Sequence, residues 1–392
     1  MNKLVERVWE NKKLRMAILA VTALLALISV VQGCRNAAAF SQDFQWDAAK
    51  VFTLRINPYE ESLAPSGILK QYGYEEYFKQ MEANQFPSLL MLLIPYTLLP
   101  PLAARYAWLA SNLLFTAGII WLLKKTFLKR VEQDVFVFLM LLMLAGTPYR
   151  NQLGVGQHTL FAFFFFLLAV YFSEKEKGEL KVVLSLVVCY FKYTLTVPLA
   201  LYFVYKRRFR ELAASVLVHV GLTFAAAWWL DATFIDMLLE PLKVSSALAS
   251  EGGLDFGALL SGSSFSFVLA GIVMLLLFCM MLLVGQGNDG LIIGLLTLWS
   301  LIVTYHRTYD FFVLVLVAAL FYEKERTQFV KAAYAAVLLA VFFGLRIFSE
   351  SAGSKICVGT IYYMFTIGMT ALGLAYIFRD KTSGGLQKRT KV

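Results

Sequence analysis

A short polar stretch, "TYHRTYD" at residues 304–310, interrupts two apolar runs. It contains His306, one of only three histidines in the chain, with Arg307 directly after it. A charge at the centre of a bilayer costs roughly 2.5–3.5 kcal/mol even on the lenient insertion scale, so these residues favour a hydrated pocket near a membrane edge. Arginine can hold a phosphate through two hydrogen bonds. His306 and Arg307 are therefore candidates to bind a phosphate; the simpler interpretation is an interfacial turn whose arginine reaches toward water.

Two carboxylates follow the first apolar run, in "FSQDFQWDAAKVFTLRINPYE" (40–60). Asp43 and Asp47 are spaced i and i+4, so they share a face if this segment is a helix. A carboxylate within hydrogen-bonding reach of a hydroxyl can act as a general base. We rank Asp43 first and Asp47 second for that role. Together they could also hold Mg²⁺ or Mn²⁺, but we expect no metal, because basic residues can neutralise a single phosphate.

Three further segments place polar residues beside apolar runs. Lys192 lies in "FKYT", where an unpaired ammonium among apolar residues would be costly. Gln157 and His158 stand at the start of a phenylalanine-rich helix, and a helix N-terminus attracts anions. Lys192 is therefore a candidate phosphate ligand, and Gln157 and His158 are candidates to contact a sugar hydroxyl or a phosphate. Arg150 is a weaker candidate for the same contact as Gln157 and His158. His219, within "SVLVHVGL", is expected to be an interior histidine whose hydrogen bonds are satisfied.

The composition indicates an all-α, polytopic membrane protein that forms one domain over residues 1–392. Of the 392 residues, 59% are hydrophobic and 16% are charged, and several apolar stretches are long enough to span a bilayer. The segment 86–101 is short and proline-rich, which predicts a re-entrant or interfacial piece. We predict about twelve passes: 15–33, 102–123, 133–148, 158–173, 211–230, 265–284, 290–304, 309–322, 331–348 and 358–378, with two short helices that go in and come back over 181–205.

The distribution of basic residues predicts the orientation. Along this path "KKTFLKR", "KRRFR" and "QKRTKV" fall on one side, together with the N-terminus and the tail 379–392. The positive-inside rule makes that side cytoplasmic in a cell membrane. The outer side then carries a long first loop, 34–101, a second loop, 231–264, and the polar segments described above except the one that contains His219. Cys34 and Cys357 also fall outside, so a disulfide between them is possible. The formal charge of +10 thus belongs to cytoplasmic loops, and we expect no nucleic-acid partner.

Five stretches, in order along the chain, resemble one known family. They are "DFQWDAAKVFTLRINPYE", "FPSLLMLLIPYTLLPPLAARYAWLASNLL", "LGVGQHTLFAFFFFLLA", "FKYTLTVPLALYFVYKRRFREL" and "YHRTYDFFVLVL". The pattern is similar to that of the polyprenol-phosphate-mannose-dependent mannosyltransferase-like proteins, glycosyltransferase family 87 of the GT-C superfamily. Ser88, Thr159 and Tyr193 depart from the family's usual proline, asparagine and proline.

The resemblance implies a GT-C helix bundle and an inverting transferase. Such an enzyme would move mannose, or another hexose or pentose, from a polyprenyl phosphate to a glycan or glycolipid on the outer face of the membrane. It places the catalytic carboxylate in the first outer loop, which favours Asp43. The cationic candidates would then hold the donor phosphate or orient the acceptor. "GVGQHT" is no dinucleotide fingerprint, since no strand precedes it, and no soluble domain is large enough for a nucleotide sugar.

Alternatives from other classes of protein remain open. A transporter or lipid flippase would tend to show internal repeats and broken helices at mid-bilayer, whereas the polar residues here favour one edge. A lipid-linked glycan polymerase or ligase would share the donor type and side but is expected to carry its main loop late in the chain. A non-catalytic membrane assembly protein is a third alternative.

Overall fold

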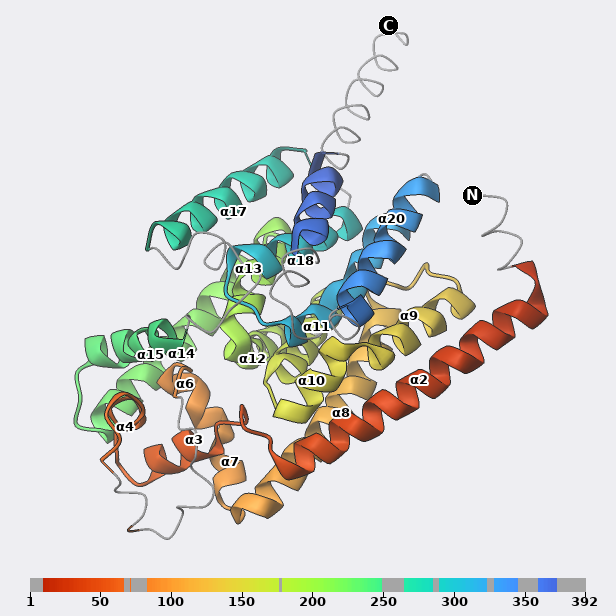
Figure 1. Ribbon diagram of the computed structural model, residues 1–392. Helices are drawn as coiled ribbons and strands as arrows, with labels where there is room; N and C mark the ends of the chain where they lie inside the picture. The colour runs from red at the N-terminus through yellow and green to blue at the C-terminus, as the bar shows by residue number, and fades with distance from the viewer. Residues whose placement is uncertain are drawn as a thin grey trace, which may run out of the picture.

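The computed structural model describes residues 10–66, 71, 83–175, 178–248, 264–284, 289–322, 328–344 and 359–371. Every regular element in these ranges is helical, which agrees with the all-α prediction (Figure 1). The elements are α2 (Lys12–Ala39), α3 (Trp46–Thr53), α4 (Pro58–Leu63), α6 (Pro87–Leu90), η1 (Met91–Leu93), α7 (Ile94–Thr97), α8 (Pro101–Lys125), α9 (Gln133–Ala145), α10 (Thr147–Val155), α11 (Thr159–Glu174), α12 (Glu179–Cys189), η2 (Tyr190–Lys192), α13 (Tyr193–Tyr205), α14 (Phe209–Trp229), α15 (Phe234–Leu248), α17 (Ser264–Val284), α18 (Asp289–Val303), η4 (Thr308–Ala318), α19 (Ala319–Tyr322), α20 (Gln328–Leu339) and η5 (Ala340–Gly344).

Several of these helices are suited to a membrane. Among the described residues, four helical stretches have the required length and apolar composition: Lys12–Ala39, Pro101–Lys125, Glu179–Tyr205 and Phe209–Trp229. The pair α10 and α11, bent by 107°, would add a fifth span if it crosses as one. The chain is therefore a helical membrane protein, while the count of twelve passes stays a prediction.

The stretch Glu179–Tyr205 is not straight. Near its start, the Lys181 ammonium lies 5.7 Å from the centroid of the Phe172 ring. Just beyond its end, Arg208 donates to the carbonyl of Ser173 at 3.0 Å. Both ends thus meet the last turns of α11, whereas a straight helix of this length would hold them ~40 Å apart. The chain doubles back at η2, as the two short helices expected here require, and Lys192 lies at the turn.

Contacts between helices define two ends of the bundle. Arg15 pairs with Asp134 at 3.0 Å, which joins the starts of α2 and α9, and Lys129 pairs with Glu174 at 3.6 Å, which joins the loop between α8 and α9 to the end of α11. We call this the Lys12 end. At the opposite end, which we call the Asp43 end, Trp108 of α8 donates to the carbonyl of Gly156 at 2.8 Å. Figure 1 shows the short helices α3, α4, α6 and α7 gathered at one end of the bundle near α15.

One expected segment differs from the prediction. Residues 149–155 lie between the predicted spans 133–148 and 158–173, yet they belong to helix α10 instead of a connecting turn. Helix α10 packs closely on α2: a Cβ on Gly33 would lie 3.1 Å from the Leu153 side chain. The absence of a side chain at Gly33 is what allows this approach. In α11, Phe163 and Phe166 are fully buried, so this face of the phenylalanine-rich helix packs in the core.

Some sequence-based expectations fall outside the described residues. These include residues 249–263 of the second outer loop, Cys357 and the tail 379–392. The apolar residues of 66–85 also predict a short amphipathic helix on the membrane surface, and most of that segment lies outside the described residues. Within the second loop, α15 is described and packs near α4 and α14.

Candidate active site

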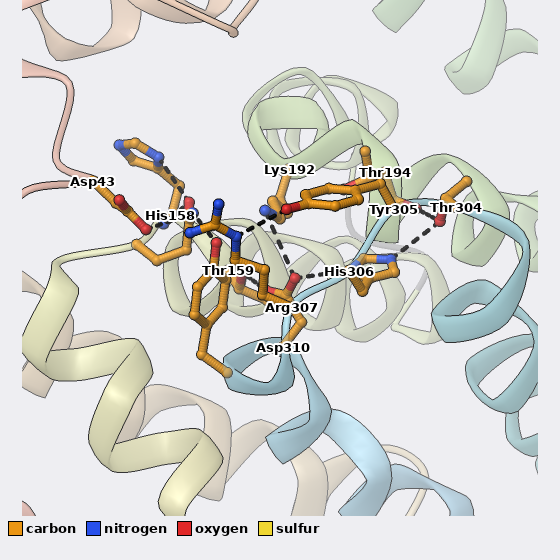
Figure 2. Close-up of polar contacts among 12 residues, drawn as sticks. Asp43, His158, Thr159, Lys192, Thr194, Thr304, Tyr305, His306, Arg307 and Asp310 are labelled. Carbon is orange, nitrogen blue, oxygen red and sulfur yellow. Dashed lines mark hydrogen bonds and ion pairs between the residues drawn. The ribbon is translucent and has the colours of Figure 1, made fainter. Parts of the chain in front are cut away.

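Side chains from four distant segments meet at the Asp43 end of the bundle. They come from the loop after α2, the α10–α11 junction, the turn at η2, and residues 304–310 (Figure 2). Figure 2 shows Asp43, Lys192, Arg307 and Asp310 around a common space. Residues that are far apart in the sequence are therefore brought to one place. We call Asp43, Lys192, Arg307 and Asp310 the polar cluster.

Asp310 lies at the buried centre of the polar cluster. One carboxylate oxygen accepts the hydroxyl of Thr159, and the other accepts Nδ1 of His306 at 2.8 Å. The Lys192 ammonium lies 3.7 Å from that second oxygen. Asp310 and His306 are fully buried and Lys192 is 9% exposed. A buried carboxylate requires such partners, because an unpaired charge would be expensive in this environment.

Lys192 reaches Asp310 because the helix is interrupted there. Its backbone angles, φ −110° and ψ 66°, are not helical, and they mark the turn between η2 and α13. Thr196 donates its hydroxyl to the carbonyl of Cys189 at 2.7 Å, which satisfies a backbone group left over at the break. The turn is thus locally stable without a glycine or proline at Lys192.

Asp43 is attached to the α10–α11 junction. Its amide donates to the Val155 carbonyl at 2.8 Å, and the Gln157 side-chain amide donates to its carboxylate at 3.2 Å. The same Gln157 nitrogen is 2.9 Å from the Tyr309 hydroxyl. Gln157 therefore links the first outer loop to residues 304–310.

The junction itself depends on Gly156 and His158. Gly156 ends α10 in the left-handed region, at φ 71°, and a Cβ there would lie 3.1 Å from Ser41. His158 is buried, with Nε2 donating to the Phe44 carbonyl at 2.9 Å and its amide donating to the Gln157 side chain at 2.8 Å. Through these two hydrogen bonds His158 orients Gln157 and Phe44, the residue after Asp43.

The surroundings of Asp43 act on its pKa in opposing directions. Burial raises the pKa of the Asp43 carboxyl, and the positive charges of Lys192 and Arg307 lower it, with the net effect an increase above the usual value. The side chain remains partly exposed, as does Arg307. A half-buried carboxylate with a raised pKa is suited to accept a proton from a hydroxyl.

Most of the sequence-predicted residues come together, but two do not. Asp43 precedes α3, whereas Asp47 stands in its first turn and accepts the amide of Ala48 at 3.0 Å. The premise that both carboxylates share a helical face is therefore wrong, because the chain turns at Gln45, where φ is 57°. Arg150 lies on α10 and donates to Gln32 of α2 at 3.3 Å.

His219 has a hydrogen-bond partner for each ring nitrogen, as the sequence predicts, but its side chain is only partly buried. Its ring nitrogens lie 2.9 Å from the Ser88 hydroxyl and 2.9 Å from the Val187 carbonyl.

Sequence reasoning did not select Thr159, Tyr309 and Asp310 as site residues. The available signal was the spacing of His306 and Asp310 in "TYHRTYD", which allows the two side chains to meet within one turn. Across the described residues, no group of three His, Cys, Asp or Glu side chains is placed to hold a metal ion.

An apolar groove of about 440 Å³ lies between α6, α13, α14 and α15. Tyr190 and Tyr193, which flank Lys192 along the chain, form part of its wall. Val197 and Val216 line it as well and are about half exposed, so the groove opens at the surface of the helix bundle.

A family model supplies an independent comparison. The model of glycosyltransferase family 87 matches residues 87–304, a range that includes Gln157, His158 and Lys192 and excludes Asp43 and His306. Neither the curated proteins nor the solved structures gave a match. The family supports a glycosyltransferase over the transporter and assembly-protein alternatives. Because the matched residues make up more than half of the sequence, the chain belongs to glycosyltransferase family 87.

Proposed function

We propose that the protein transfers a sugar, with inversion, from a polyprenyl phosphate to a hydroxyl of a glycan or glycolipid. The observation that carries this proposal is the meeting of Asp43 with Lys192 and Arg307, which come from three separate segments. Asp43 can take a proton while Lys192 and Arg307 face a departing phosphate. A single displacement at an anomeric carbon needs both the removal of that proton and the departure of the phosphate.

Asp43 is the proposed general base. As the acceptor hydroxyl attacks the sugar, its proton passes to the Asp43 carboxylate, and the bond between the sugar and the phosphate oxygen breaks. Gln157 fixes one carboxylate oxygen through its 3.2 Å contact. We assign no such role to Asp47, which stands in the first turn of α3 and accepts the amide of Ala48.

Lys192 and Arg307 are the proposed ligands of the phosphate. The 3.7 Å separation between Lys192 and Asp310 is an ion pair longer than a hydrogen bond, so the ammonium can turn a proton toward a phosphate oxygen. Negative charge grows on that oxygen as the sugar leaves, and nearby cations stabilise it. His306 is fully buried behind Asp310, and we assign it to hold that carboxylate instead of touching the donor.

The apolar groove supports a lipid-linked donor. Its wall adjoins Lys192 through Tyr190 and Tyr193, so a phosphate at the polar cluster would have an apolar path for its hydrocarbon chain. The resemblance to polyprenol-phosphate-mannose-dependent proteins points to the same donor class and to mannose as the first sugar to test. No divalent metal is assigned a role.

The outer face of the cytoplasmic membrane is the proposed location. Lys12, Lys13 and Arg15 stand at one end of α2, while Asp43 follows its other end. A helix of 28 residues is ~42 Å long, enough to cross the bilayer. The positive-inside rule puts the basic end in the cytoplasm and therefore Asp43 outside.

Purified protein in lipid nanodiscs tests this function. A panel of polyprenyl phosphates carrying mannose, glucose, galactose or arabinose is offered with octyl α-mannopyranoside as acceptor. Transfer from one of them, with the anomeric configuration inverted by NMR, supports the proposal. Retained configuration contradicts single displacement. Movement of the lipid across a bilayer without any transfer would instead support a flippase.

A further inference from the structure

Three side-chain amides form a second polar group, and one of them, Gln45, stands two residues after Asp43 along the chain. Gln45 Nε2 donates to Asn84 Oδ1 at 2.5 Å, and Gln85 Nε2 lies 3.4 Å from the same oxygen. Gln45 is 9% exposed and Gln85 is 5% exposed. Among the described residues, nothing donates a hydrogen bond to the Oε1 atom of either glutamine. We call Gln45, Asn84 and Gln85 the amide group.

Two unsatisfied buried acceptors in one place are unfavourable. Each costs about 1–3 kcal/mol, because water that would bond to it in the unfolded chain is lost. Gln45 also has a positive φ of 57°, which is uncommon for a residue with a side chain. Strain and unmet hydrogen bonds of this kind persist where the surrounding structure enforces them, and they cluster at binding sites.

The segment "NPY" (57–59) at the start of α4 holds the amide group in position. The Tyr59 hydroxyl, fully buried, donates to the backbone carbonyl of Gln85 at 2.7 Å. Ser62 accepts the amide of Ala83 at 2.9 Å, and Asn57 caps the start of α4 by accepting the amide of Tyr59 at 3.0 Å. Helix α4 therefore fixes residues 83–85 against the turn that contains Gln45, two residues after Asp43 along the chain.

We infer that the amide group binds the hydroxyls of a sugar ring at the reaction centre. Sugar hydroxyls are donors, and the two free Oε1 atoms are acceptors, so binding satisfies them without introducing charge. Asn84 is partly exposed, which gives the amide group an approach from the surface. This inference rests on the proposed function, since it names the contact that sugar transfer would use. The ring belongs either to the donor or to the acceptor, and the two are separated by experiment.

The test replaces Gln85 with methionine, which has a similar size and no amide. The protein is studied in nanodiscs with three probes: polyprenyl phosphate mannose, the same polyprenyl phosphate without sugar, and octyl α-mannopyranoside. Gln45→Met is the second variant. Asn112→Leu is the matched control, because Asn112 is also a buried amide without a described hydrogen-bond partner for its side chain but lies on α8.

Gln85→Met is expected to weaken binding of one sugar-bearing probe about two- to tenfold, the loss of one neutral hydrogen bond. Binding of the sugar-free phosphate stays unchanged, and so does binding of all three probes to Asn112→Leu. Weaker binding of polyprenyl phosphate mannose assigns the amide group to the donor, and weaker binding of octyl mannoside assigns it to the acceptor. The thermal midpoint is unchanged or higher, because an unsatisfied acceptor has been removed.

Three results overturn the inference. The first is unchanged binding of both sugar-bearing probes in Gln85→Met and in Gln45→Met. The second is an equal loss for the sugar-free phosphate. The third is a lower thermal midpoint with unchanged binding, which would make Gln85 a structural residue. Failure of the proposed function has a different signature, because wild-type protein would then bind none of the polyprenyl phosphates and transfer no sugar.

Discussion

The Lys192 ammonium and the Asp310 carboxylate lie 3.7 Å apart, and both side chains are nearly or fully buried. Neither stands within a regular α-helix: Lys192 lies at the turn between η2 and α13, and Asp310 lies at the start of a 3₁₀ segment. The pair joins the two halves of the polar cluster. Each charge is stable there because the other is present.

Removing one charge of this pair should therefore destabilise the fold more than removing both. Asp310→Asn leaves Lys192 without its counter-ion, and we expect a loss of about 3–5 kcal/mol in the free energy of unfolding. The double variant Lys192→Met with Asp310→Asn should recover part of that stability but no activity. Thermal unfolding of the two single variants and the double variant measures the coupling. Additive losses would show that the two charges do not interact.

Loss of the Lys192 charge alone should weaken use of the donor. Lys192→Met removes a charge-assisted hydrogen bond of about 1.5–3 kcal/mol, so kcat/KM for the donor should fall about 10- to 100-fold. Arg150→Met is the control, because Arg150 contacts Gln32 instead of the polar cluster. Comparable losses for both variants would remove Lys192 from the phosphate site.

Gly156 should tolerate no side chain. Its φ of 71° and the 3.1 Å approach of Ser41 predict that Gly156→Ala lowers the free energy of unfolding by more than about 1 kcal/mol and displaces Gln157. Gly221 of α14 has open space around it, so Gly221→Ala should raise stability by about 0.5–1 kcal/mol. The two thermal midpoints, measured in the same detergent, check the contrast. Equal shifts in the same direction would contradict it.

Activity should depend on the ionisation of Asp43. Burial raises the pKa of this carboxyl, so the rate should fall with decreasing pH around a midpoint above the usual aspartate value of about 3.9. In the window between the usual and the raised pKa, the folded protein binds more protons than the unfolded chain. Asp43 therefore makes stability fall as pH rises through that window, and Asp43→Asn should make the slope shallower. A rate profile with its acid midpoint at or below 3.9 would contradict the assignment.

Patterns in the sequence predict the helical class, the family and most of the polar cluster. Charges in apolar stretches are costly, so Lys192, His306 and Arg307 stand out as exceptions along the chain. Gln157 and His158 stand out because they begin an apolar helix.

The remaining features depend on contacts between distant segments. In the sequence, Asp310 resembles any other residue of a polar turn, and only the approach of Lys192 and Thr159 reveals it as the centre of the polar cluster. The spacing of Asp43 and Asp47 would place them on one face only if both stood in the same helix. The positive φ at Gln45 breaks the chain between them, so the spacing is misleading. Helix α10 was not predicted because its position depends on close packing against α2. Gly33, far away in the sequence, leaves the space for that packing.

The role of Asp43 is tested most directly by comparing Asp43→Asn with Asp47→Asn, both purified in nanodiscs and supplied with saturating polyprenyl phosphate mannose and acceptor. General-base catalysis contributes typically about 10²- to 10⁴-fold, so Asp43→Asn should lose at least about 100-fold in the rate of transfer while inserting and unfolding normally. Asp47→Asn should stay within about threefold of wild type. Full transfer by Asp43→Asn, or an equal loss in both variants, would contradict the assignment of Asp43 as the base.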